Sequence, residues 1–160
     1  MSRRTAKETF EFTPPDITRA CGALAELRQL GDGWMNLLPG VPEGAAEPEP
    51  AGLFAIFGNR AAPVTMATVI PPKAERRAGE GVSVGIMHPT GPKAVARLRE
   101  AGVEVPDGWV VRQDHARRGL VFRTPPTAPD NEILTFAVRA GDALCLVATT
   151  GRWQAVVYRS

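Results

Sequence analysis

The chain has 160 residues, enough to bury a core of ordinary size within one domain. Hydrophobic residues make up 44% of the sequence and charged residues 22%, proportions that exclude a wholly disordered chain. The net charge of +2 and the aromatic content of 6% fall short of the basic and aromatic surfaces that bind nucleic acids, so no nucleic-acid partner is expected.

The sequence contains no recognisable targeting or membrane segment. The N-terminal Ser2-Arg3-Arg4 is followed by polar residues, and no run approaches the roughly 18 apolar residues of a membrane span. Cys21 and Cys145 lie far apart, and both are expected to be reduced, small, buried residues. We therefore expect a cytoplasmic protein, and the preference for arginine over lysine, with many Ala, Gly, Pro and Val residues, favours a bacterial source.

Residues 1–12 are polar and predict a flexible N-terminal segment, which precedes a single α+β domain over residues 13–160. Thr13-Pro14-Pro15-Asp16 has the chemistry of a helix start, and apolar residues at spacings of three and four follow from Ile17 to Leu27. Gly31 is expected to end this helix.

The rest of the chain predicts short strands and two further helices. Apolar residues between 32 and 40 are expected to pack, and 41–52 predict an exposed loop. Expected strands are 53–57 and 64–70 as a hairpin, 82–87, 109–113, 120–123 and 151–158; expected helices run from Thr90 to Gly102 and over 128–145. This order predicts an α+β fold with a mixed or antiparallel sheet of about five to six strands and three helices mainly on one face.

Residues 81–85 spell G-x-S-x-G, the pattern of a hydrolase nucleophile. In hydrolases the serine stands on a sharp turn between a strand and a helix. Here the residues before Ser83 are typical of a turn and those after it continue a strand, so Ser83 is expected to be an ordinary strand residue.

The joint between the third strand and the second helix is the best candidate site. His88-Pro89-Thr90-Gly91-Pro92-Lys93 offers a histidine, a hydroxyl, a cation and a helix N-terminus, which together favour an anion. The simpler interpretation is a helix start capped by Thr90, because Pro92 removes one N–H group and the residues do not match a Walker loop.

A second basic feature lies at the predicted hairpin tip, residues 114–119. His115, Arg117 and Arg118 either form a solvated turn or, if the tip meets the Thr90 loop in space, complete a pocket for a phosphate or carboxylate. His88 and His115 are the candidate proton-transfer residues, and Thr90, Gly91, Lys93, Arg117 and Arg118 are the candidate ligand-binding residues.

No spacing of residues predicts a metal site or a cofactor, and Trp34, Trp109 and Trp153 are expected as core anchors. Without a credible nucleophile, the sequence favours a non-catalytic binding or protein-interaction module, with a homodimer as one possible arrangement. The alternative is an enzyme or regulator that binds an anionic small molecule at the helix beginning near Thr90. The sequence leaves open whether the chain is catalytic.

Overall fold

The described part of the chain contains one antiparallel sheet in the order β1-β7-β2-β3-β4-β6-β5. The computed structural model describes residues 6–43, 64–76 and 79–160. Its strands are β1 (Ala6–Phe12), β2 (Trp34–Pro39), β3 (Met66–Ile70), β4 (Ser83–Met87), β5 (Val110–His115), β6 (Gly119–Arg123) and β7 (Trp153–Arg159); its helices are α1 (Thr18–Leu30), α3 (Ala94–Glu100) and α4 (Asp130–Ala143), with a short 3₁₀ turn at Ala74–Arg76.

These elements confirm an α+β fold with three α-helices among the described residues, and they correct the predicted number of strands in the sheet. The sheet has seven strands rather than five to six, and every pair in it is antiparallel. Two strands account for the difference, because β1 falls in the segment expected to be flexible and β2 falls in a stretch to which no element was assigned.

β1 differs from the expectation of a flexible segment over residues 1–12. Phe10 and Phe12 are buried on one side of the strand, whereas Lys7, Thr9 and Glu11 are exposed. The period of two is that of a strand, but only two apolar residues mark it. Hydrogen-bonded pairing along the whole of β7 stabilises this strand, which its two apolar residues alone would not do.

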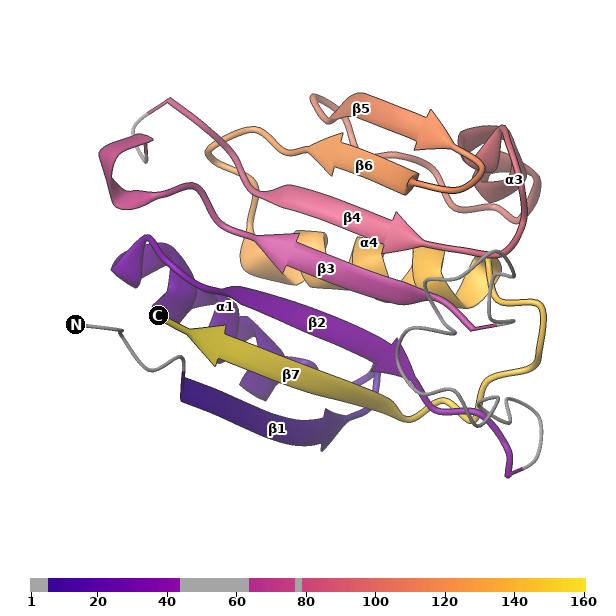
Figure 1. Ribbon diagram of the computed structural model, residues 1–160, viewed down its shortest axis with the longest axis horizontal. Helices are drawn as coiled ribbons and strands as arrows, with labels where there is room; N and C mark the ends of the chain where they lie inside the picture. The colour runs from indigo at the N-terminus through magenta and orange to yellow at the C-terminus, as the bar shows by residue number, and fades with distance from the viewer. Residues whose placement is uncertain (1–5, 44–63, 77–78) are drawn as a thin grey trace.

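Helices α1 and α4 cover one face of the sheet, and α4 lies behind the central strands in Figure 1. Side chains alternate along β7, so that Trp153, Ala155 and Val157 enter the core on the helix side. Gly141 of α4 provides room for the ring of Trp153, since a Cβ there would lie 2.8 Å from the ring. Burial of this face is the main source of stability for the fold.

Helix α1 begins later than the sequence predicts. Thr13 and Asp16 form a turn in which the Asp16 N–H donates to the Thr13 carbonyl, and the Asp16 carboxylate then accepts from the Thr18 N–H. The two prolines therefore lie in the turn and not in the first turn of the helix. The predicted end is confirmed, because Gly31 adopts a left-handed conformation with φ of 65°.

Arg28 fastens α1 to the segment that leads into α4. Its guanidinium donates to the carbonyls of Pro126 and Ala128, both at 2.9 Å, and to the Asp130 carboxylate at 2.7 Å. Helix α4 starts at Asp130, two residues after the predicted start, and ends at Ala143 rather than at 145.

Strand β3 has β2 and β4 as its two neighbours. The first strand of the hairpin predicted for 53–57 and 64–70 lies outside the described residues, as does most of the predicted loop over 41–52. None of the described helices has the length and apolar character that crossing a membrane requires.

Candidate functional site

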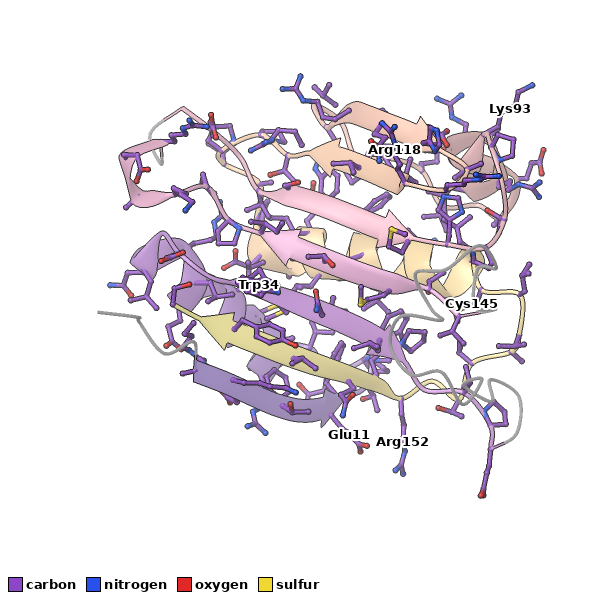
Figure 2. The ribbon with its side chains drawn as sticks, viewed as in Figure 1. Glu11, Trp34, Lys93, Arg118, Cys145 and Arg152 are labelled. Atoms are coloured by element: carbon purple, nitrogen blue, oxygen red, sulfur yellow. The ribbon has the colours of Figure 1, made fainter. Side chains whose placement is uncertain are left out.

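The Thr90 loop and the tip of the β5–β6 hairpin lie side by side. The carboxylate of Asp114, near the end of β5, accepts hydrogen bonds from the backbone N–H groups of Ala94 at 3.0 Å and Val95 at 3.2 Å. Lys93 and Arg118 accordingly occupy the same corner of the molecule in Figure 2. The structure thus brings together the two segments that the sequence analysis singled out.

At this corner the backbone donors of α3 are occupied by the protein itself. Helix α3 has only seven residues, and its first two N–H groups point to the Asp114 carboxylate. Lys93 precedes the helix in a left-handed conformation with φ of 61°, and Gly91 also has a positive φ of 82°. A carboxylate of the chain therefore takes the place that the sequence offered to an external anion.

Thr90 does not cap α3 as expected. Its hydroxyl lies 2.9 Å from Nδ1 of His88, and its backbone N–H donates to the same nitrogen at 3.3 Å. Since Nδ1 accepts the backbone N–H of Thr90, the proton of the neutral ring is on Nε2. Thr90 thus fixes the His88 ring and takes no part in the helix start.

His88 is buried, with 5% of its surface exposed. Its Nε2 atom is buried and has no hydrogen-bond partner among the described residues. Burial lowers the pKa of His88 below its ordinary value of 6.5, Asp114 opposes this shift, and Arg97 adds to it. The ring is therefore neutral at pH 7.

His115 closes the hairpin tip. Its Nδ1 accepts the backbone N–H groups of Arg117 at 3.0 Å and Arg118 at 3.1 Å. The side chains of Lys93, Arg117 and Arg118 are exposed at the corner. His88 is buried beneath this corner, and His115 accepts hydrogen bonds within the hairpin turn. Each histidine is therefore engaged in a local contact.

The G-x-S-x-G pattern has a structural explanation. Ser83 begins β4, where it pairs with Ile70 and Arg123, as the expectation of a strand residue requires. Gly81 lies against Thr124, and a Cβ on it would come within 1.6 Å of the Thr124 carbonyl oxygen. The first glycine therefore permits the close passage of two backbone segments.

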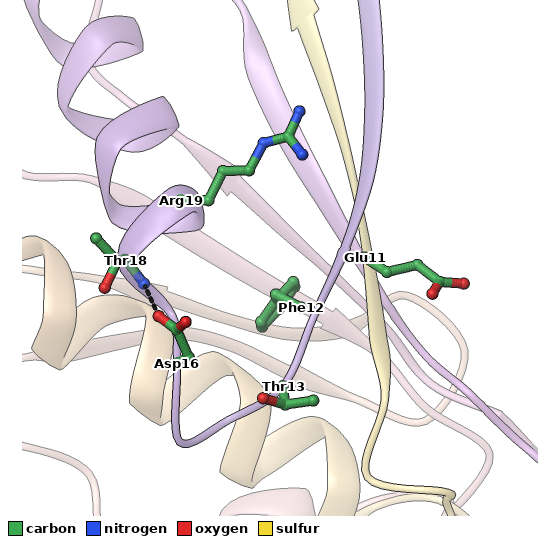
Figure 3. A pocket seen from close by; sticks show the side chains of 6 residues that line it. All are labelled: Glu11, Phe12, Thr13, Asp16, Thr18 and Arg19. Atoms are coloured by element: carbon green, nitrogen blue, oxygen red, sulfur yellow. Dashed lines mark hydrogen bonds between the residues drawn. The ribbon is translucent and has the colours of Figure 1, made fainter.

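Two open depressions occur on the surface of the described residues. One, of about 480 Å³, is lined by Glu11, Phe12, Thr13, Asp16, Thr18 and Arg19. Figure 3 shows that the side chains of Glu11 and Arg19 extend in different directions and that the Asp16 carboxylate accepts a hydrogen bond from the Thr18 N–H. Its polar groups do not converge on a common point.

The second depression, of about 290 Å³, lies between α4 and the segment after α3; it is lined by Val103, Glu104, Pro106, Asn131, Glu132, Thr135, Phe136 and Arg139. One of its polar groups, Glu132, already accepts a hydrogen bond from Nε1 of Trp109 at 3.2 Å. Neither depression includes the residues of the Thr90 corner. No group of three or more His, Cys, Asp or Glu residues suited to a metal ion occurs in the part of the chain that the structure describes.

The two free cysteines are half-buried. Cys21 packs against the core, as expected, and burial raises the pKa of its thiol, with a further contribution from Asp130. Cys145 lies 3.3 Å from the hydroxyl of Thr65, which donates to the Gly141 carbonyl.

The face of the sheet opposite α1 and α4, here called the open face, has no helix on it among the described residues. Across it, Lys7 pairs with Tyr158 and Tyr158 with Trp34. In the register of β2 and β3 this row continues from Ile70 through Ser83 and Arg123 to Val110. A central row comprises Thr9, Val156, Asn36, Thr68, Gly85, Val121 and Gln113.

An aromatic pair dominates this face. The rings of Trp34 and Tyr158 are stacked, with centroids 4.7 Å apart and planes inclined by 17°. Trp34, which Figure 2 labels over β2 and β7, is half-buried, whereas Trp109 and Trp153 are core residues as expected. The expectation of a core position for Trp34 is therefore wrong.

Sequence reasoning missed this surface because β2 reads as an apolar run. Met35, Leu37 and Pro39 are buried on the helix side, and Trp34 and Leu38 alternate with them on the open face. Only Asn36 marks the period, and it accepts a hydrogen bond from Thr68 across the strands at 2.9 Å. The alternation in β7, where Gln154 and Tyr158 share a face, was the signal that could have located it.

Comparisons of the chain with models of protein families, with curated proteins and with solved structures find no match.

Proposed function

We propose that this chain is a non-catalytic protein-interaction module and that the open face of its sheet binds the partner. The carrying observation is the stacked pair of Trp34 and Tyr158 on a face that none of the described helices covers. Aromatic rings provide much contact area for little loss of side-chain entropy, and they dominate protein interfaces.

The surroundings of the pair support an apolar contact. Ile70 is 45% exposed and Val110 51% exposed, and both belong to the same row of the open face. Leu38, Met66 and Met87 are half-buried along neighbouring strands. Methionines adapt their shape to a partner, and an extended apolar surface of this kind marks an interaction site.

The charges of this face favour a protein over a nucleic acid. Among the residues that the printed strand pairs place on it, the cations are Lys7 and Arg123, and Arg123 already lies 3.5 Å from the carboxylate of Glu80. Binding to phosphates would require several cations spread along the surface. A broad sheet face that lacks a row of cations is suited to the apolar side chains of another protein.

The Thr90 corner supports the alternative function less well. Its exposed cations surround a helix start whose first N–H groups already bind Asp114. A small anion would have to displace that carboxylate or bind to flexible cationic side chains alone. The open face requires no such rearrangement, so we place the interaction there.

A photo-crosslinking residue at Ile70 tests the proposal in cells that naturally produce the chain. We expect a specific adduct with one other protein, and no such adduct from the same residue at Leu30. Leu30 is the matched control because it is 53% exposed and belongs to α1, on the other side of the sheet.

The partner identified in this way is then purified and its affinity measured by calorimetry. We expect Trp34→Ala to weaken binding about 30-fold, the effect of losing an aromatic hot spot. Leu146→Ala, at a position that is 64% exposed and lies outside the strands, should leave the affinity unchanged. Equal adducts from Ile70 and Leu30, or an affinity that is insensitive to Trp34→Ala, would contradict the proposal.

A further inference from the structure

Strand β1 is an edge of the sheet. It is hydrogen-bonded only to β7 among the described strands, and no labelled element lies beyond it in Figure 1. No described strand pairs with the backbone groups on its outer side, and such a row is a ready template for pairing between chains.

The opposite edge, β5, is less suitable for such pairing. It contains a register shift between Val111 and Gln113, and its Asp114 is engaged with α3. Bulges of this kind interrupt the hydrogen-bonding row of an edge. β1 is regular over all seven of its residues.

Side chains of β1 are complementary to those of a second β1 in one register. When two copies of a strand pair antiparallel about a two-fold axis in one continuous sheet, directly opposite side chains lie on the same side of the sheet. The axis must therefore pass through a residue and not between two residues. With the axis at Thr9, all seven residues of each strand pair and Lys7 faces Glu11 of the other copy, twice.

The neighbouring registers lack this complementarity. An axis at Glu8 places this carboxylate opposite its own copy, and like charges directly opposite each other are destabilising. An axis at Phe10 places Glu11 opposite Thr9 and moves Lys7 beyond the end of the strand. The charges of β1 thus favour the Thr9 register over both alternatives.

Glu8 is compatible with the Thr9 register because its charge is already compensated. Its carboxylate oxygens lie 3.1 Å from Arg19 and 2.9 Å from Arg159, and the hydrogen bonds from these arginines lower the pKa of Glu8. Arg19 also stacks over the ring of Phe10 at 4.3 Å. Glu8 of one copy would lie beside Phe10 of the other, and α1 supplies the counter-charge to both.

We propose that two copies of this chain associate through β1, antiparallel and with the two-fold axis at Thr9, so that their sheets become continuous. The association is isologous and closed, since each copy offers the same edge. It places the open faces of the two copies side by side on one surface. The proposal does not depend on the function proposed for that face.

Charge reversal tests the pairing by light scattering and sedimentation over a range of concentrations. We expect the full chain to form dimers and Lys7→Glu to raise the dimer dissociation constant about ten-fold or more, because two attractive pairs become repulsive. Lys7→Glu combined with Glu11→Lys restores the complementarity and should restore the dimer. Arg99→Glu, the same charge change at an exposed position of α3, should have no effect.

A disulfide tests the register. With Cys21 and Cys145 replaced by serine, Thr9→Cys places two thiols opposite each other at the axis, and mild oxidation should link the copies. Glu11→Cys places each thiol opposite Lys7 and should link them far less. A chain that stays monomeric at every concentration, or a dimer that ignores Lys7→Glu, would overturn the proposal and leave the crosslinking result at Ile70 unaffected.

Discussion

The ring of His88 is held by one nitrogen only. Nδ1 accepts from Thr90, whereas the buried Nε2 lacks a hydrogen-bond partner in the part of the chain that the structure describes. A buried donor without an acceptor costs about 1–3 kcal/mol. Protonation would add a charge to this site, where Asp114 favours it and Arg97 and burial oppose it.

This arrangement predicts a loss of stability in mild acid. The folded-state pKa of His88 lies below its ordinary value of 6.5, so the unfolded chain takes up a proton first as the pH falls. The free energy of unfolding should therefore decline below pH 6.5, by at most about 1.4 kcal/mol per pH unit, and should be unaffected by this residue above it. Urea unfolding between pH 7.5 and 5.5 measures the decline.

The second histidine provides the control, since the chain has only two. His88→Gln should flatten the decline between pH 7.5 and 5.5, whatever its effect on stability at pH 7.5. His115→Gln should keep the decline, because it leaves the buried ring of His88 in place. A decline of the same slope in both variants would show that another group is responsible.

Among the elements, α3 depends on a residue from a different part of the chain. Asp114 replaces the local cap, so Asp114→Ala should lower the free energy of unfolding by about 1 kcal/mol, the usual cost of a lost cap. Amide hydrogen exchange should accelerate in residues 94–100 more than elsewhere. Asp114→Asn retains one acceptor oxygen and should cost less.

Asp107→Ala is the matched control for this effect. Asp107 is an exposed carboxylate in the turn that follows α3, and its removal should change stability by no more than about 0.5 kcal/mol. If Asp114→Ala has no larger effect than Asp107→Ala, the carboxylate does not stabilise α3 and the helix start is open to an external anion.

The sequence predicted elements where local chemistry decides the structure. Gly31 ends α1, and the alternation of Trp153, Ala155 and Val157 defines β7. The predictions failed where a contact with a residue far away in the sequence decides the structure. β1 forms a strand because β7 pairs with it. Asp114 caps α3 in place of Thr90, and it lies twenty positions from Ala94 in the sequence.

The same distinction applies to the candidate site. The sequence named His88, Thr90, Lys93 and the hairpin tip, and the structure places them at one corner. The sequence does not reveal that a carboxylate between them satisfies the helix, because that contact depends on how the β5–β6 hairpin packs against α3. Trp34 and Tyr158 are far apart in the chain and become a pair only through the order of strands in the sheet.

On the scale of the whole molecule, the two faces of the sheet differ in what covers them. The helix face is packed by α1 and α4, and its central side chains are fully buried. The open face retains exposed and half-buried apolar groups. The proposed interaction requires this difference, because a face that is already part of the core is not available to a partner.

Adjacent residues of β3 test the difference directly. Val69 faces the helices and is 0% exposed, whereas Ile70 faces the open side and is 45% exposed. Val69→Lys would bury an ammonium group without a counter-charge and should abolish folding, as judged by circular dichroism and by tryptophan fluorescence in urea. Ile70→Lys places the same group in solvent and should cost about 1 kcal/mol or less. A comparable loss in both variants would mean that the open face is covered in the native protein, and the binding surface would then have to be sought at the edges of the sheet.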